Sequence, residues 1–145
     1  MYKRITNILP LDKKKKTISV LGLTFKPNTD DMRDSPSLDL IPALIKQNFE
    51  VRVFDPEGME EAKKSLIKYK SQIIWCKNAY EAALNADVLV ILTEWNEFRS
   101  LSPERLKKYM KGNILIDLRN ALNAEIFRES GFKLIQVGRP NIPNQ

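Results

Sequence analysis

The sequence contains no histidine and a single cysteine, Cys76. Zinc sites are built mainly from cysteine and histidine ligands, and serine or cysteine nucleophiles are usually activated by a histidine. The chain therefore cannot supply a Cys/His zinc site, a Cys/His pair or a Ser/His pair, and we expect no metal site. A lone cysteine beside Trp75, at the end of an apolar run, is typical of a small buried side chain.

Long apolar runs and glycine-rich loops are also missing. No stretch approaches the roughly 18 consecutive apolar residues of a membrane span, and residues 1–16 lack the apolar segment and cleavage site of a signal peptide. We therefore expect a cytoplasmic protein that is not associated with a membrane. Only Gly22 follows the first apolar run, so the GxGxxG fingerprint of dinucleotide-binding domains is absent.

The formal net charge of +6 is concentrated at the amino terminus. Residues 1–16 hold six basic residues against one acidic residue, which leaves 18 basic and 17 acidic residues over 17–145. No aromatic residue interleaves the run of four lysines at 13–16. This pattern is typical of a solvated lead-in, and we expect no nucleic-acid partner.

Short β-branched runs alternate with amphipathic stretches along the rest of the chain. The expected strands are 17–23, 51–56, 73–76, 87–93, 113–118 and 132–138, and the expected helices are 35–48, 58–70, 78–86, 102–110 and 123–130. Regular alternation predicts a Rossmann-like α/β domain of three layers, with a mostly parallel sheet of about six strands and helices on both faces. The expected domain is 17–139, preceded by a linker at 1–16 and followed by a tail at 140–145.

Three charged loops follow the first, fourth and fifth expected strands. Ligands of open parallel sheets bind beyond the carboxyl ends of the strands, which is where these loops lie. Lys26, Arg33 and Arg119 could converge there from loops far apart in the sequence. Lysine as a point charge and arginine as a two-pronged donor would suit a diphosphate.

The first loop also has a simpler interpretation. Asp30, Asp31 and Asp34 could neutralise Lys26 and Arg33 within a solvated turn. The residues alone leave both interpretations open.

Other residues at these loops are equally open to two interpretations. Arg119 could form an ion pair with Asp117. Asp55, after the second strand, could bind a ribose or cap the next helix. Trp95 and Phe98 could pack at the sheet or stack on a base.

A receiver-type signalling domain has a similar alternation of strands and helices. Thr93 fits the threonine of that class, but no acid follows the third strand as phosphate acceptor, and Arg119 stands where a lysine is needed. The sequence disfavours this class.

Four blocks of the sequence carry a family resemblance. In order, they are GLTFKPNTDDMRDSPSLDLI, VRVFDP, ADVLVILTEWNEFR and IDLRN. At these spacings they closely resemble the carboxy-terminal UDP-sugar-binding domain of UDP-glucose 6-dehydrogenases and their UDP/GDP-sugar dehydrogenase relatives. The resemblance covers about residues 17–139.

The resemblance implies a catalytic context that this chain does not contain. Enzymes of this family oxidise UDP-glucose to UDP-glucuronate with two NAD, through a covalent intermediate on a cysteine. An amino-terminal NAD-binding domain and a central domain with the catalytic cysteine precede this domain, and a connecting helix forms the homodimer. Cys76 lies in no motif that matches the nucleophile, so we expect no catalytic residue here and no activity of this chain alone.

The resemblance also implies roles for individual residues. Lys26, with the backbone of Phe25 beside it, would contact the nucleotide-sugar, and Arg119 would lie at its UDP portion. Arg33 would reach the NAD. The same domain of a UDP-N-acetylmannosamine or GDP-mannose dehydrogenase, or a free-standing nucleotide-binding or regulatory module without catalysis, remains an alternative.

Overall fold

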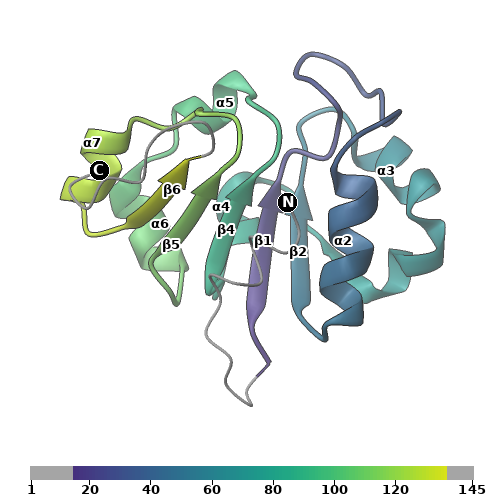
Figure 1. The fold of residues 1–145 in the computed structure, drawn as a ribbon, viewed down its shortest axis with the longest axis horizontal. Helices are drawn as coiled ribbons and strands as arrows, with labels where there is room; N and C mark the ends of the chain where they lie inside the picture. The colour runs from purple at the N-terminus through teal and green to yellow at the C-terminus, as the bar shows by residue number, and fades with distance from the viewer. Residues whose placement is uncertain (1–14, 137–145) are drawn as a thin grey trace.

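The computed structural model describes residues 15–136, which form one sheet of six parallel strands (Figure 1). The strands are β1 (Thr17–Leu21), β2 (Glu50–Phe54), β3 (Ile73–Trp75), β4 (Val88–Ile91), β5 (Ile114–Asp117) and β6 (Lys133–Gln136). Their order in the sheet is β3-β2-β1-β4-β5-β6. This is the order of doubly wound dinucleotide-binding folds, in which the direction of winding reverses between β1 and β4. The predicted fold class is confirmed.

The helices follow the strands in alternation. They are α2 (Ser37–Lys46), α3 (Met59–Ser65), α4 (Ala79–Ala83), α5 (Asn96–Arg99), α6 (Pro103–Tyr109) and α7 (Ala124–Glu129), and a 3-10 segment, η1 (Ile67–Gln72), follows α3. The single turn α5 was expected to be part of a loop. It has no side-chain hydrogen bond at its amino end, so the sequence gives little signal for it.

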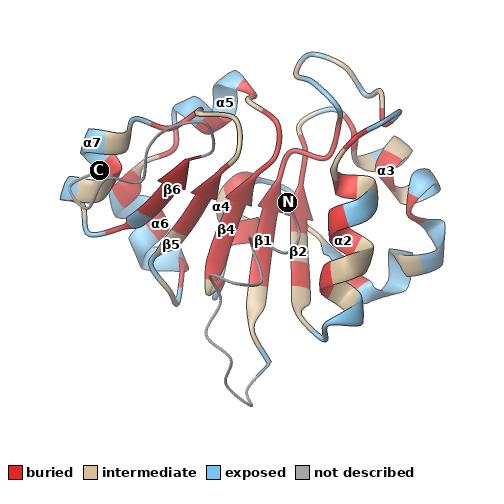
Figure 2. Cartoon of the chain, viewed as in Figure 1, coloured by how far each residue is buried: buried red, intermediate tan, exposed pale blue. Residues whose placement is uncertain are grey.

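Helices cover both faces of the sheet, as the sequence predicted. Successive residues of a strand point to opposite faces, and Ile18 and Val20 of β1 therefore join a core with α2 and α3. Leu21 faces the other core, to which α4, α5, α6 and α7 contribute side chains. Figure 2 shows the central strands buried along most of their length, which explains their near-continuous apolar sequences.

The ends of the chain bear on two expectations. The predicted tail at 140–145, and the predicted lead-in at 1–16 except its last two residues, lie outside the described residues. Over 15–136, no helix is long and apolar enough to cross a membrane.

Candidate functional site

The loop between β1 and α2 (22–36, the β1–α2 loop) begins at Gly22 and stands above the carboxyl ends of the strands (Figure 1). Gly22 has φ +91°, in the region that favours glycine, and its N–H donates to the Phe54 carbonyl at 2.9 Å. A Cβ atom there would lie 2.6 Å from the Cβ of Thr93. Glycine thus allows the β1–α2 loop to pass directly against the loop that follows β4.

Hydroxyl groups fix both ends of the β1–α2 loop. Thr93 Oγ1 donates to the carbonyl of Thr24 at 2.7 Å, which ties the loop to the end of β4. The hydroxyls of Ser35 and Ser37 donate to the Leu23 carbonyl at 2.5 and 2.7 Å. All five residues at these contacts are buried, so these bonds hold the start and the end of the loop together.

Asp55 anchors this loop to the loop that follows β2. One carboxylate oxygen accepts from the N–H groups of Leu23 and Thr24 at 2.7 and 3.1 Å, and the other accepts from Glu57 and Gly58 at 2.9 and 2.7 Å. Asp55 is 1% exposed. Both oxygens are therefore occupied by backbone donors. This arrangement supports the interpretation that Asp55 caps the start of α3 over the interpretation that it binds a ribose.

Arg33 and Asp31 form an ion pair on the β1–α2 loop. Both oxygens of Asp31 accept from the Arg33 guanidinium, at 2.9 to 3.2 Å, and one of them also accepts from the Arg33 N–H. These hydrogen bonds lower the pKa of Asp31 to about 2. The Arg33 side chain remains 87% exposed. The interpretation of this loop as a self-neutralising turn is therefore correct for this pair.

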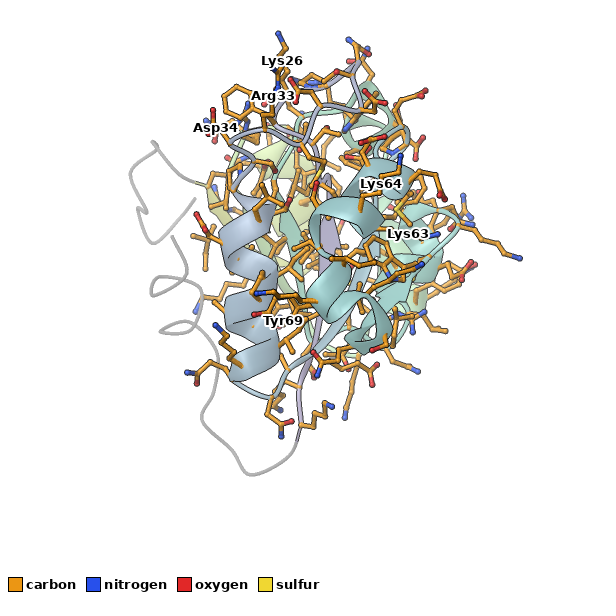
Figure 3. The ribbon with its side chains drawn as sticks, turned by 90° about the vertical axis from the view of Figure 1, so that its right-hand side faces the viewer. Lys26, Arg33, Asp34, Lys63, Lys64 and Tyr69 are labelled. Carbon is orange, nitrogen blue, oxygen red and sulfur yellow. The ribbon has the colours of Figure 1, made fainter. Side chains whose placement is uncertain are left out.

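Lys26 differs from Arg33 in having no such partner. Within residues 15–136 its ammonium makes no hydrogen bond or ion pair, and the residue is exposed. Its neighbour Phe25 is 45% exposed, and the Phe25 N–H donates to the Asp31 carbonyl at 3.1 Å. Figure 3 shows Lys26 and Arg33 at the same end of the molecule, with Lys26 projecting outward.

Arg119, after β5, forms its ion pair with Glu94 and not with Asp117. Its Nε and Nη2 atoms donate to the two carboxylate oxygens of Glu94, the latter at 3.1 Å. This contact raises the pKa of the Arg119 guanidinium. The partner considered from the sequence, Asp117, is buried, and among residues 15–136 it accepts from the Arg119 backbone N–H, at 3.1 Å, and from Leu122 and Gln136. Sequence reasoning missed Glu94, which lies 25 residues away and carries no local signal.

The three cations share the carboxyl end of the sheet, but no contact joins Arg119 to Lys26 or Arg33 within the part of the chain that the structure describes. Two surface hollows lie beside the β1–α2 loop. One, of about 640 Å³, includes Asp30, Asp31 and Glu61 together with Arg33, and the other, of about 550 Å³, includes Asp30 and Glu57. Neither hollow includes Lys26 or Arg119 among its lining residues, so the convergence of the cations stays a prediction.

The aromatic residues after β4 serve the core. Trp95 is 7% exposed and Phe98 is fully buried, with its ring packed edge-on against Phe54 at a centroid distance of 6.4 Å. Of the two interpretations, the structure supports packing over base stacking. Cys76 is likewise buried, and burial raises the pKa of its thiol, as expected of an inert cysteine.

Residues 19–124 match the protein-family model described as "UDP-glucose/GDP-mannose dehydrogenase family, UDP binding domain". The chain belongs to this family. The match to the UDP binding domain includes the β1–α2 loop, Glu94 and Arg119. The predicted family resemblance is confirmed.

Curated relatives of this UDP binding domain are much longer proteins. The UDP-glucose 6-dehydrogenase of Rhizobium meliloti is 49% identical over 124 residues, which are 86% of this chain and 28% of the relative. The UDP-glucose 6-dehydrogenase of Rickettsia prowazekii is 39% identical over 138 residues, which are 95% of this chain and 31% of the relative. The chain therefore spans less than a third of the length of the relatives it matches.

Solved structures share the fold. A UDP-D-ManNAc dehydrogenase from Pyrococcus horikoshii matches with a TM-score of 0.69 and 29% identity, over 96% of this chain and 28% of that chain. An NDP-N-acetyl-D-galactosaminuronic acid dehydrogenase from Methanosarcina mazei Go1 matches with a TM-score of 0.70 and 25% identity, over 86% and 25%. The UDP binding domain is again a minor part of each neighbour.

Proposed function

We propose that this chain is the UDP-sugar-binding domain of a UDP-glucose 6-dehydrogenase, whose complete form oxidises UDP-glucose to UDP-glucuronate with two NAD. The match of residues 19–124 to the UDP binding domain carries the proposal. The two relatives described above, at 49% and 39% identity, are both UDP-glucose 6-dehydrogenases, which favours UDP-glucose over other nucleotide-sugars as the substrate.

In this proposal, Lys26, the Phe25 backbone and Arg119 bind the nucleotide-sugar. The exposed and unpaired ammonium of Lys26 suits a diphosphate as a point charge. Arg119 keeps the N–H groups that Glu94 does not use, and these form a planar fork that fits two phosphate oxygens. Both groups lie on loops at the end of the sheet where ligands of this topology bind.

Arg33 would contact the NAD. Its side chain is 87% exposed, and Asp31 occupies only Nε and Nη2, so the other side of the guanidinium can meet a phosphate. The chain has no GxGxxG loop, so the cofactor would be bound mainly by an amino-terminal domain of the same enzyme. The proposed partners within the complete enzyme are that domain and a central domain that carries the catalytic cysteine. The complete enzyme would form a homodimer in the cytoplasm.

A turnover assay tests this function. The complete gene product, mixed with NAD, is supplied in turn with UDP-glucose, UDP-N-acetylmannosamine and GDP-mannose, and NADH is followed by absorbance. We expect NADH with UDP-glucose, at a ratio of about two NADH to one UDP-glucose, because oxidation of an alcohol to a carboxylate removes two hydrides.

The 145-residue chain is the matched control in that assay. We expect it to form no NADH with any of the three substrates, because it lacks both the glycine fingerprint and a cysteine in a nucleophile motif. Sustained turnover by this chain, or a complete gene product inactive with every nucleotide-sugar, would contradict the proposal.

A further inference from the structure

Glu94 holds the Arg119 guanidinium from one side. Its two carboxylate oxygens accept from Nε and from Nη2, so the contact is the two-point arrangement that fixes the plane of the guanidinium. The Arg119 side chain is 32% exposed and that of Glu94 is 22% exposed. A pair that is this far buried is more ordered and less screened than a surface ion pair.

The contact leaves a defined part of the guanidinium available. An arginine side chain carries five N–H groups, one on Nε and two on each terminal nitrogen. Glu94 uses one on Nε and one on Nη2, so both N–H groups of Nη1 and one of Nη2 remain. No other acceptor contacts them among residues 15–136. These atoms form the second fork of the guanidinium, which fits two oxygens of a phosphate.

The backbone that carries Arg119 is fixed independently. Asp117 accepts from the Arg119 N–H at 3.1 Å and from the Leu122 N–H at 2.8 Å, and it is fully buried. These hydrogen bonds therefore fix the position of the Arg119 backbone, but Asp117 makes no contact with the Arg119 guanidinium. Within the described residues, only Glu94 sets the direction of the side chain.

Glu94 also connects Arg119 to the loop that carries Lys26. Its neighbour Thr93 donates to the Thr24 carbonyl at 2.7 Å, and Thr24 Oγ1 donates to the Lys26 carbonyl at 3.0 Å. The two cations proposed for the nucleotide-sugar are thus linked through the end of β4, by contacts that are buried or partly buried. A change at Glu94 would release the Arg119 end of this linkage and leave the Lys26 end intact.

We propose that Glu94 is a positioning residue for nucleotide-sugar binding, because it presents the free fork of Arg119 to the diphosphate. The inference rests on the proposed role of Arg119. A carboxylate near the site also repels an anionic ligand. Each oxygen of that carboxylate is already paired with an N–H group of Arg119, which offsets the repulsion, whereas a released arginine must be ordered again each time the ligand binds. Removal of Glu94 should therefore weaken binding.

A double-mutant cycle in the complete gene product tests the proposal. The dissociation constant of UDP-glucose is measured by calorimetry for the wild type, Glu94→Ala, Arg119→Ala and the double variant. We expect Glu94→Ala to raise it by about fivefold, and Arg119→Ala by more, because an ordering cost is smaller than a lost charge-assisted contact. In the Arg119→Ala background, Glu94→Ala should change it by less than about twofold, since the two residues act through one interaction.

Two controls separate positioning from damage to the fold. Glu97→Ala removes a carboxylate from the same segment, where it forms no ion pair with Arg119, and it should leave the UDP-glucose affinity unchanged. The urea unfolding midpoint of Glu94→Ala should also stay close to that of the wild type, because a misfolded domain would unfold at a lower denaturant concentration.

The possible failures are distinct. If Arg119→Ala binds UDP-glucose as tightly as the wild type, the proposed role of Arg119 is wrong and the role of Glu94 is wrong with it. If Arg119→Ala weakens binding but Glu94→Ala tightens it, leaves it unchanged, or weakens it equally in both backgrounds, Arg119 keeps its role and Glu94 is not its positioning residue.

Discussion

At the scale of residues, both arginines proposed to bind ligands are held from one side by a carboxylate. Asp31 holds Arg33 and Glu94 holds Arg119, each through Nε and Nη2. An arginine used in this way can bind a second anion with the N–H groups that remain. The acids around the cations are therefore compatible with ligand binding, and the role left open for Asp31 is explained by its contact with Arg33.

The pKa of Asp31 provides a test of its pair with Arg33. The folded-state pKa of about 2 lies below the ordinary 3.8, so the pair contributes stability above about pH 4 and loses it as the pH falls toward about 2. We expect carboxyl NMR to show Asp31 still largely ionised near pH 3.

The matched variant for this titration is Arg33→Ala. It should return the Asp31 pKa toward 3.8, because the hydrogen bonds that lower it are lost. Identical Asp31 titration curves in the two proteins would show that the pair does not form in solution.

The positions of the site residues and the pairing of Arg33 with a nearby acid were predictable from sequence, but the partners of Arg119 and Asp55 were not. Lys26, Arg33 and Arg119 each follow a strand with a clear apolar signal, and parallel strands bring their carboxyl ends together. Arg119 nevertheless pairs with Glu94, and Asp55 is bound by donors from residues up to 32 positions away. Such choices depend on how loops from separate strands meet, which no local pattern contains.

At the scale of elements, the strands were predicted well because most of their residues are buried and many are β-branched or apolar. The helices were less accurate at their ends. The expected helix 58–70 is α3 followed by the 3-10 segment η1, in which no residue is buried. Without an apolar face to bury, the second half of that stretch gains little from continuing as an α-helix.

The crossing of two loops at Gly22 gives a prediction for stability. Gly22→Ala combines an unfavourable positive φ with a Cβ placed 2.6 Å from Thr93, inside the buried region that holds the β1–α2 loop. We expect a loss of roughly 3 kcal/mol in the free energy of unfolding, measured with urea.

Gly131→Ala is the matched control for this crossing. Gly131 also has a positive φ, +99°, but its Cβ would meet only the flexible end of Lys107, at 3.1 Å. Its cost should be about 1 kcal/mol, which is the conformational strain alone. Equal losses at the two positions would mean that the close approach to Thr93 adds nothing.

At the scale of the whole molecule, the strand order and the family agree. The order β3-β2-β1-β4-β5-β6 places the β1–α2 loop and the loop after β4 side by side at the point where the winding reverses. Side-chain cations stand at this end of the sheet where related folds use glycines and backbone N–H groups. The domain thus combines a dinucleotide-binding topology with exposed side-chain cations in place of the glycine fingerprint.

We propose above all that the cations at the carboxyl end of the sheet bind two different ligands. The most direct test is calorimetry of UDP-glucose and of NAD with the complete gene product and its Lys26→Ala, Arg119→Ala and Arg33→Ala variants. We expect the first two to weaken UDP-glucose binding by about tenfold or more with little change for NAD, and Arg33→Ala to do the reverse. Unchanged UDP-glucose affinity in both Lys26→Ala and Arg119→Ala would contradict the claim.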